Sequence, residues 1–258
     1  MKLRIWAALA RGVLLESLRR KDLWVVAILG FIIIVSAGAL GFFGITGLEV
    51  FAKDLAFTVL GLFSTIIAIM TASRMLPDEI KNRTLYPLLA RPISRFDLLL
   101  GKLLGAIVVT WAAFLLLAAL TAVALAMFHV RFEWIMAQYL VVKMLGLAVL
   151  CSVSLALSTF MTPSAAATMS FVLALGSATV VRALVLAYAT SSAPMQVVFK
   201  VVNLSVPQYQ LFDLGSRAAN IGWPPVPLWV VAFLFAYAVL YSAAMLLLGW
   251  AKLRRQAI

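Results

Sequence analysis

The sequence predicts an all-α membrane protein, and its composition is the first reason. Hydrophobic residues make up 65% of the 258 positions, charged residues only 12%, and the mean hydropathy is +1.11. A soluble domain of this length needs far more polar surface. Only helices and closed barrels satisfy their backbone polar groups in lipid, and the apolar runs lack the alternation of barrel strands. We therefore expect a single transmembrane domain over residues 1–258.

Six apolar runs are long enough to cross a membrane, because about 20 residues of helix span roughly 30 Å of hydrocarbon. The second run is the least sharply bounded, since Arg74 lies near its end and the helix can continue beyond the membrane. The predicted spans are 23–43, 55–76, 103–128, 136–160, 166–189 and 227–250.

The distribution of cations predicts the orientation. Of the 21 Lys and Arg residues, fifteen fall on the side that holds both termini, four on the opposite side and two inside spans. Cytoplasmic loops are enriched in Lys and Arg, so both termini are expected in the cytoplasm. The membrane is expected to be the inner membrane of a bacterial-type cell. The net charge of +12 is explained in this way, without nucleic acid as a partner.

Two segments outside the spans are expected to be helical. In residues 1–22 the apolar side chains up to Val13 fall on one side of a helical wheel, and the pattern weakens after it. This indicates an interfacial helix on the cytoplasmic face; a plain basic tail is the alternative. Residues 190–226 combine an apolar run with Pro207 and a proline cluster, which predicts short interfacial or re-entrant helices on the outer face. The chain has no internal repeat of the kind that inverted-repeat secondary transporters carry.

The charged segment 77–102, between the second and third spans, is expected to form two helices on the cytoplasmic face. Pro77 followed by two acidic residues is typical of a helix start. The residue before Pro92 avoids the α region, so the first helix is expected to end there. Ser94 suits the N-cap of the second helix, with Asp97 at the acidic position of a capping box.

Glycines in this segment suit helix packing rather than nucleotide binding. Gly101 and Gly105 have the GxxxG spacing that lets another helix approach closely. A phosphate-binding P-loop would need glycine at Phe96 and a hydroxyl residue at Leu103, after Gly101-Lys102. We therefore expect no nucleotide hydrolysis, and no enzyme activity, in this chain.

A family resemblance rests on the same segment. Its residues resemble the signature that joins the second and third spans of ABC-2 type transporter permeases, and Arg83 before Thr84 is most similar to the branch associated with multicopper-enzyme maturation. Many members have glycine where this chain has Arg83. The matching positions are Glu79, Thr84, Leu88-Leu89, Pro92, Ser94-Arg95 and Gly101-Lys102.

The resemblance implies a role for the segment and a set of partners. It implies a coupling helix that docks on a separate ATP-binding subunit, which would carry ATP and Mg, and a dimer of two six-span subunits. The alternative is a loop whose cations only fix topology and bind lipid headgroups. The residues expected to dock are Glu79, Lys81, Arg83, Thr84, Leu88, Arg91 and Arg95.

Lys143 and Arg182 are the clear charges inside predicted spans. An intramembrane charge is a functional hypothesis by default. Each lies about seven residues, on the order of 10 Å, from the outer end of its span, so a long side chain can also snorkel to the interface. They are candidates for an anion-attracting site in a transport path, with snorkelling as the alternative.

Other chemistries lack the residues they need. His129 and Glu133 have helical spacing for a metal, but no third ligand accompanies them. Cys151 is the single cysteine and lies in an apolar run, where a packed thiol is expected. The sequence thus favours the permease subunit of an ATP-driven exporter, export being implied by the resemblance alone. A membrane anchor or assembly factor that transports nothing, and a secondary carrier, remain the alternatives.

Overall fold

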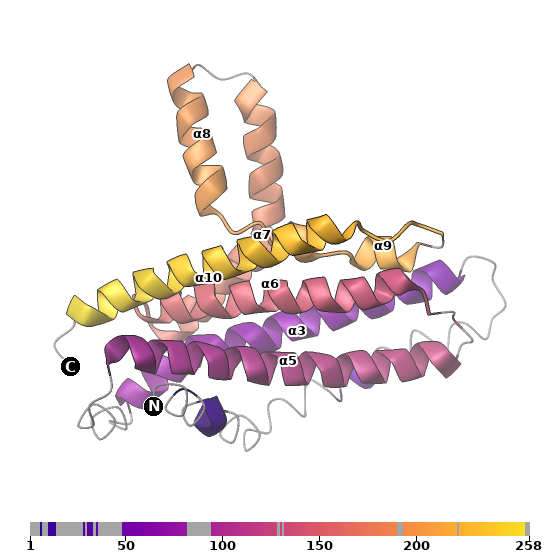
Figure 1. Ribbon diagram of the computed structural model, residues 1–258, viewed down its shortest axis with the longest axis horizontal. Helices are drawn as coiled ribbons and strands as arrows, with labels where there is room; N and C mark the ends of the chain where they lie inside the picture. Colours follow the sequence, from indigo (N-terminus) through magenta and orange to yellow (C-terminus); the bar gives the residue numbers. More distant parts are fainter. Residues whose placement is uncertain are drawn as a thin grey trace.

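The computed structural model describes residues 6, 10–13, 28, 30–32, 35, 48–81, 94–127, 130, 132–189, 193–220 and 222–255. These residues form helices, with no strand among them. Figure 1 labels the principal ones. Their bounds are α3 (Leu48–Lys81), α5 (Arg95–Met127), α6 (Trp134–Ser158), α7 (Pro163–Ala189), α8 (Ala193–Ser205), the 3-10 turn η2 (Tyr209–Phe212), α9 (Gly215–Ala219) and α10 (Leu228–Arg255).

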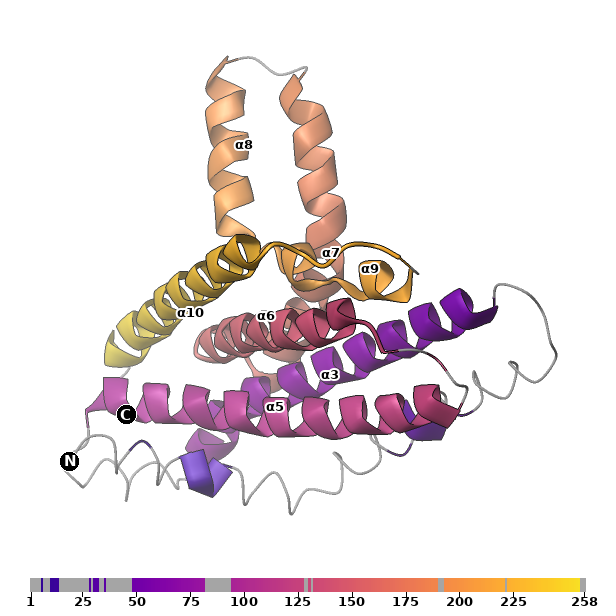
Figure 2. The same cartoon turned by 45° about the vertical axis from the view of Figure 1, so that its right-hand side comes forward.

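Helices α3, α5, α6 and α10 lie side by side and form the bundle (Figures 1 and 2). Helix α6 is at its centre, in contact with α3, α5, α7 and α10. Of its most apolar 18-residue window, 61% of the residues are buried, against 17% for α10. A helix that is apolar all round is expected to be surrounded by other helices, and α6 has this composition. The core of the bundle therefore forms around α6.

Helices α7 and α8 form a hairpin that projects steeply away from the bundle in both views (Figures 1 and 2). The first part of α7 packs against α3 and α6, where Ala166, Ser170 and Ser177 are buried. Further along the helix, Val185 and Leu186 are exposed. Only the base of the hairpin therefore belongs to the core.

Five described helices are long and apolar enough to cross a membrane, namely α3, α5, α6, α7 and α10. They coincide with the second to sixth predicted spans. The first predicted span, 23–43, lies outside the described residues except for a few helical positions.

The predicted helix start at Pro77 is wrong. Pro77 lies inside α3, which continues to Lys81. A proline there removes one backbone hydrogen bond and crowds the carbonyl of Ser73. The packing of the preceding turns, with Leu76 1% exposed, offsets this cost. The second predicted span is part of a longer helix, since α3 has 34 residues, and its continuation beyond the membrane stays a prediction.

The predicted start of α5 is confirmed. The backbone N–H of Asp97 donates to the Ser94 hydroxyl at 3.1 Å, and that hydroxyl donates to the Asp97 carboxylate at 2.6 Å. The first contact satisfies one of the N–H groups that a helix start leaves free, and the second holds the Ser94 hydroxyl in place. The indole N–H of Trp6 donates to the other Asp97 oxygen at 3.0 Å, so part of segment 1–22 contacts this end of α5.

Gly105 shows the close approach that its spacing predicted. A Cβ atom at this position would lie 2.8 Å from the Cβ of Val13, which is buried. The partner at Gly105 is therefore the N-terminal segment. The rest of the predicted interfacial helix, apart from Trp6 and residues 10–13, lies outside the described residues.

Candidate functional site: a charged cleft between α3 and α6

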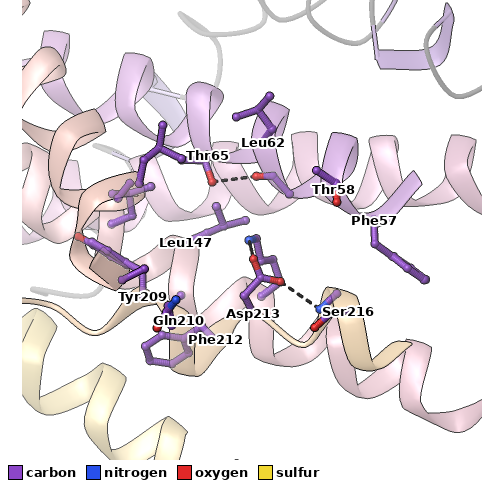
Figure 3. A pocket seen from close by; sticks show the side chains of 18 of the residues that line it. Phe57, Thr58, Leu62, Thr65, Leu147, Tyr209, Gln210, Phe212, Asp213 and Ser216 are labelled. Carbon is purple, nitrogen blue, oxygen red and sulfur yellow. Dashed lines mark hydrogen bonds and ion pairs between the residues drawn. The ribbon is translucent and has the colours of Figure 1, made fainter. Parts of the chain in front are cut away.

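A cleft of about 410 Å³ lies between α3, α6, α7 and the segment that runs from η2 into α9. Figure 3 shows residues of this segment, among them Gln210 and Asp213, facing Thr58, Leu62 and Thr65 of α3 across the open space. We call it the α3–α6 cleft. Its lining consists of Asp54, Phe57, Thr58, Gly61, Leu62, Thr65, Lys143, Gly146, Leu147, Leu150, Ala174, Leu175, Ala178, Tyr209, Gln210, Phe212, Asp213, Gly215 and Ser216.

Phe212 anchors the η2 segment to the bundle. Its side chain is 1% exposed and lies directly on Gly146 of α6, where an added Cβ would be 2.6 Å from the Phe212 Cβ. Its ring also lies 5.9 Å from the ring of Tyr237 on α10, and the Tyr237 hydroxyl accepts a hydrogen bond from the Gln208 N–H at 3.3 Å. Because position 146 has no side chain, Phe212 packs directly against the backbone of α6. We call this contact the seat of Phe212; it holds this wall of the cleft in place.

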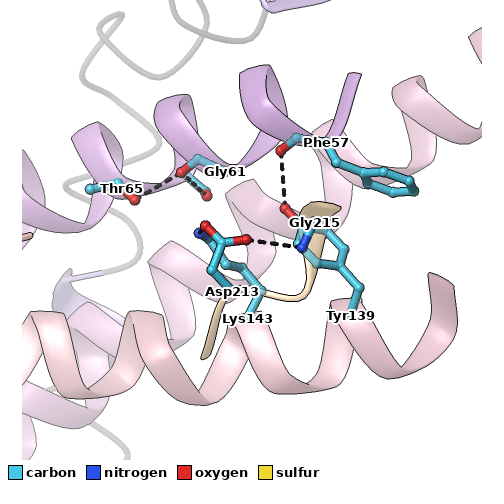
Figure 4. A network of polar contacts seen from close by, with 8 residues as sticks. Phe57, Gly61, Thr65, Tyr139, Lys143, Asp213 and Gly215 are labelled. Carbon is cyan, nitrogen blue, oxygen red and sulfur yellow. Dashed lines mark hydrogen bonds and ion pairs between the residues drawn. The ribbon is translucent and has the colours of Figure 1, made fainter. Parts of the chain in front are cut away.

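An ion pair crosses the cleft from α6 to the η2–α9 segment. The Lys143 Nζ lies 3.3 Å from Oδ2 of Asp213, and Oδ1 of Asp213 accepts the backbone N–H of Gly215 at 3.0 Å (Figure 4). The side chain of Lys143 is 13% exposed and that of Asp213 is 55% exposed. A charge in a membrane-spanning helix is expected to have a charged partner or to face a cavity, and Lys143 has both.

Gly61 of α3 makes room for the lysine. A Cβ atom at Gly61 would lie 3.1 Å from the Lys143 Nζ. The Gly61 carbonyl accepts the hydroxyls of Ser64 at 2.9 Å and Thr65 at 2.8 Å, as Figure 4 shows. The ammonium group of Lys143 therefore lies against the backbone of α3 at Gly61, whose carbonyl already accepts two hydroxyl groups.

Tyr139 fixes the distance between α3 and α6 on the side of the cleft. Its hydroxyl donates to the carbonyl of Phe57 at 3.1 Å, and the two rings lie 4.9 Å apart (Figure 4). Tyr139 is fully buried. A buried hydroxyl that has a partner costs little to desolvate, so this contact ties the two helices rather than binding a ligand.

Tyr209 contributes a neutral hydroxyl to the site. Burial raises the pKa of the Tyr209 phenol well above its ordinary value, and the neighbouring Tyr241 adds to the shift. Its hydroxyl has no hydrogen-bond partner among the residues that the structure describes. A buried polar group of this kind is expected to bind water or a ligand.

The two predicted intramembrane cations have different surroundings. Lys143 lines the cleft, whereas Arg182 is exposed on the projecting part of α7 and is not among the lining residues. Sequence reasoning missed Asp213, although an intramembrane lysine needs a counter-ion. Asp213 is the single acidic residue of the segment 190–226, and that fact was the available signal.

The predicted docking residues fall largely outside the described part of the chain. Glu79 and Lys81 belong to the last turn of α3, where the backbone is described, and positions 83, 84, 88 and 91 lie outside the described residues. The Arg95 guanidinium donates to the carbonyls of Leu253 at 2.7 Å and Arg254 at 3.3 Å. The docking role of all seven residues stays a prediction.

Glu133, one of the two residues considered for a metal, has another partner. Its carboxylate lies 3.8 Å from the ammonium of Lys53, whose side chain is 1% exposed. His129 lies outside the described residues. Within the described ranges, no group of three or more metal-ligating side chains comes together.

The apolar helices and the charged cleft define a multi-pass membrane protein. Comparison with family models identifies the family: the model of the ABC-2 family transporter protein matches residues 8–256. The chain therefore belongs to the ABC-2 transporter family. No curated protein matches its sequence. The finer assignment to the multicopper-maturation branch stays a prediction.

Proposed function

We propose that this chain is the membrane-spanning permease subunit of an ATP-driven exporter, and that a separate subunit hydrolyses ATP. The family match over residues 8–256 is the observation that carries the proposal, because members of this family are membrane subunits of ABC transporters. The α3–α6 cleft supports it, since a cavity with paired charges in membrane-spanning helices is typical of a transport path. Lys143 is the residue that we place in this path.

The cytoplasmic segment 77–102 is the proposed docking site for the ATP-binding subunit. The chain lies in an inner membrane in this proposal, with both termini in the cytoplasm. The contacts of α10 provide a mechanical connection between the docking segment and the cleft. At one end of α10, Trp250 meets Phe96 of α5 with ring centroids 6.2 Å apart. Further along the same helix, Tyr237 contacts Phe212 of the cleft wall and Gln208, which precedes η2. One continuous helix thus contacts both the end of the docking segment and the cleft wall.

The complete transporter in this proposal contains two permease subunits, identical or different, and two ATPase subunits that bind ATP and Mg. Co-expression of the tagged chain with the genes that flank its own gene tests this composition. We expect a protein with a P-loop to co-purify in detergent and to hydrolyse ATP. Purification of the chain without any ATPase, from cells in which the flanking proteins are made, would contradict the proposal.

A second experiment separates a transporter from a membrane anchor that binds the same ATPase. The double substitution of Glu79 and Arg83 by Ala should leave ATP hydrolysis by the complex in place and abolish ATP-dependent uptake of cargo into inverted vesicles. In an anchor, the unsubstituted complex would show no ATP-dependent uptake at all.

A further inference from the structure

The charges that line the α3–α6 cleft do not favour an anion. Three charged side chains are among the described lining residues: Asp54, Lys143 and Asp213. Asp213 neutralises Lys143 at 3.3 Å, and its second oxygen is held by the Gly215 N–H. One ammonium against two carboxylates leaves the lining with one net negative charge, and Asp54 is the group that remains.

Asp54 forms no ion pair with Lys53, its neighbour in sequence, or with Arg217 of α9. It is exposed, and it makes no ion pair or hydrogen bond within the part of the chain that the structure describes. Its neighbour Lys53 is buried and paired with Glu133. Arg217 of α9 lies over the ring of Trp223, 5.4 Å from its centroid. The Asp54 carboxylate is therefore available to a ligand.

The remainder of the lining is mainly apolar, with a few hydroxyl groups. Leu147 and Leu150 of α6 and Leu175 of α7 provide apolar surface, while Thr58 of α3 and Ser216 of α9 provide hydroxyls in the same lining. Pockets that bind small molecules are mostly apolar, hold a few placed polar groups and measure about 300–1,000 Å³. The cleft volume of about 410 Å³ suits a small molecule with an apolar body.

We propose that the α3–α6 cleft binds an amphipathic organic cation, with Asp54 as its counter-ion and the leucines of α6 and α7 against its apolar part. This inference rests on the proposed function, because it names the class of cargo that the permease moves. A cationic cargo differs from the anionic cargo that Lys143 indicates when the sequence is considered alone. In the folded chain Lys143 already forms an ion pair with Asp213.

Binding of ethidium, a small aromatic cation, tests the inference. The purified chain in phosphatidylcholine nanodiscs should raise the fluorescence anisotropy of ethidium above that of empty discs, with saturation. Asp54→Asn should weaken this binding about tenfold, because it removes the counter-ion and keeps the side-chain shape. Glu49→Gln is the matched control: it removes one carboxylate five residues earlier in α3 and should leave the affinity unchanged.

Two results would overturn the inference. One is ethidium binding that is equal in the unsubstituted chain and in Asp54→Asn, or absent from both. The other is saturable binding of the anion 1-anilinonaphthalene-8-sulfonate that is lost in Lys143→Gln. The assay contains neither ATP nor an ATPase, so its failure would reject the cation class and leave the permease assignment intact. Failure of the co-purification would reject the permease assignment whatever ethidium does.

Discussion

The Arg95 guanidinium donates a hydrogen bond of 2.7 Å to the carbonyl of Leu253 and thereby joins the first turn of α5 to the last turn of α10. The two residues are 158 positions apart in sequence. The last carbonyls of a helix have no intrahelical donor, and a cation there also complements the helix dipole. The docking segment thus ends in a turn that is bonded to the C-terminal helix.

Loss of this junction should destabilise the fold modestly. Arg95→Gln removes a charged donor from a partly exposed site, so we expect the free energy of unfolding to fall by about 1 kcal/mol. The measurement is the SDS-titration unfolding midpoint in mixed micelles. Arg255→Gln, at an exposed position two residues after Leu253, should leave the midpoint unchanged. Equal shifts in the two variants would show that charge alone, and not the bond, determines the effect.

Gly146 should tolerate no side chain. In Gly146→Ala the new methyl group would lie 2.6 Å from the Phe212 Cβ, so η2 must move or α6 must bend. Overpacking of this kind costs about 1–3 kcal/mol, which the same unfolding titration would detect. Gly176→Ala on α7 is the control, because no atom lies within 4 Å of the added Cβ. A destabilisation of Gly176→Ala as large as that of Gly146→Ala would contradict the proposed seat.

Gln138 should stabilise the segment that leads into α10. Its amide donates to the Val226 carbonyl and accepts the Val226 N–H, both at 2.8 Å, and both residues are buried. Gln138→Leu leaves two buried backbone groups without partners, which we expect to cost about 2–4 kcal/mol in unfolding free energy. Gln196→Leu on α8 breaks a longer bond of 3.5 Å and should cost clearly less.

The stability of the α5 N-terminus should depend on a hydrogen-bond acceptor in the side chain at position 94, and not on the size of that side chain. Ser94→Ala removes the hydroxyl that accepts the Asp97 N–H, with an expected loss of about 1 kcal/mol. Ser94→Asn restores a neutral acceptor at the same position and should recover most of that loss, since its amide can also donate to the Asp97 carboxylate as the hydroxyl does. If neither substitution moves the unfolding midpoint, the contact does not stabilise the helix.

Much of the helical architecture could be predicted from the sequence, because hydropathy reports which segments leave water. The second to sixth apolar runs correspond to α3, α5, α6, α7 and α10, and the Ser94 cap was readable from two residues. Pro77 was misread because a proline near the end of a long, packed helix does not have to start a new one.

The cleft could be predicted only in part, because hydropathy does not determine which helices become neighbours. Lys143 was noticed as an intramembrane charge, but its partner Asp213 is 70 residues away in a segment without a clear pattern. The seat of Phe212 on Gly146 depends on helix packing, which a glycine in an apolar run does not reveal. Nothing in the sequence distinguishes Asp54 as a site residue, because a carboxylate near the end of a span is common at a membrane surface.

The docking of segment 77–102 on an ATP-hydrolysing subunit is tested most directly by a cross-link. Cys151, the single native cysteine, is fully buried, so an introduced cysteine is the reactive thiol. Thr84→Cys labelled with benzophenone-maleimide should cross-link to the co-expressed P-loop ATPase on illumination. Leu228→Cys, which is 75% exposed at the far end of α10, should not. Cross-linking from position 228 and none from position 84 would contradict the account.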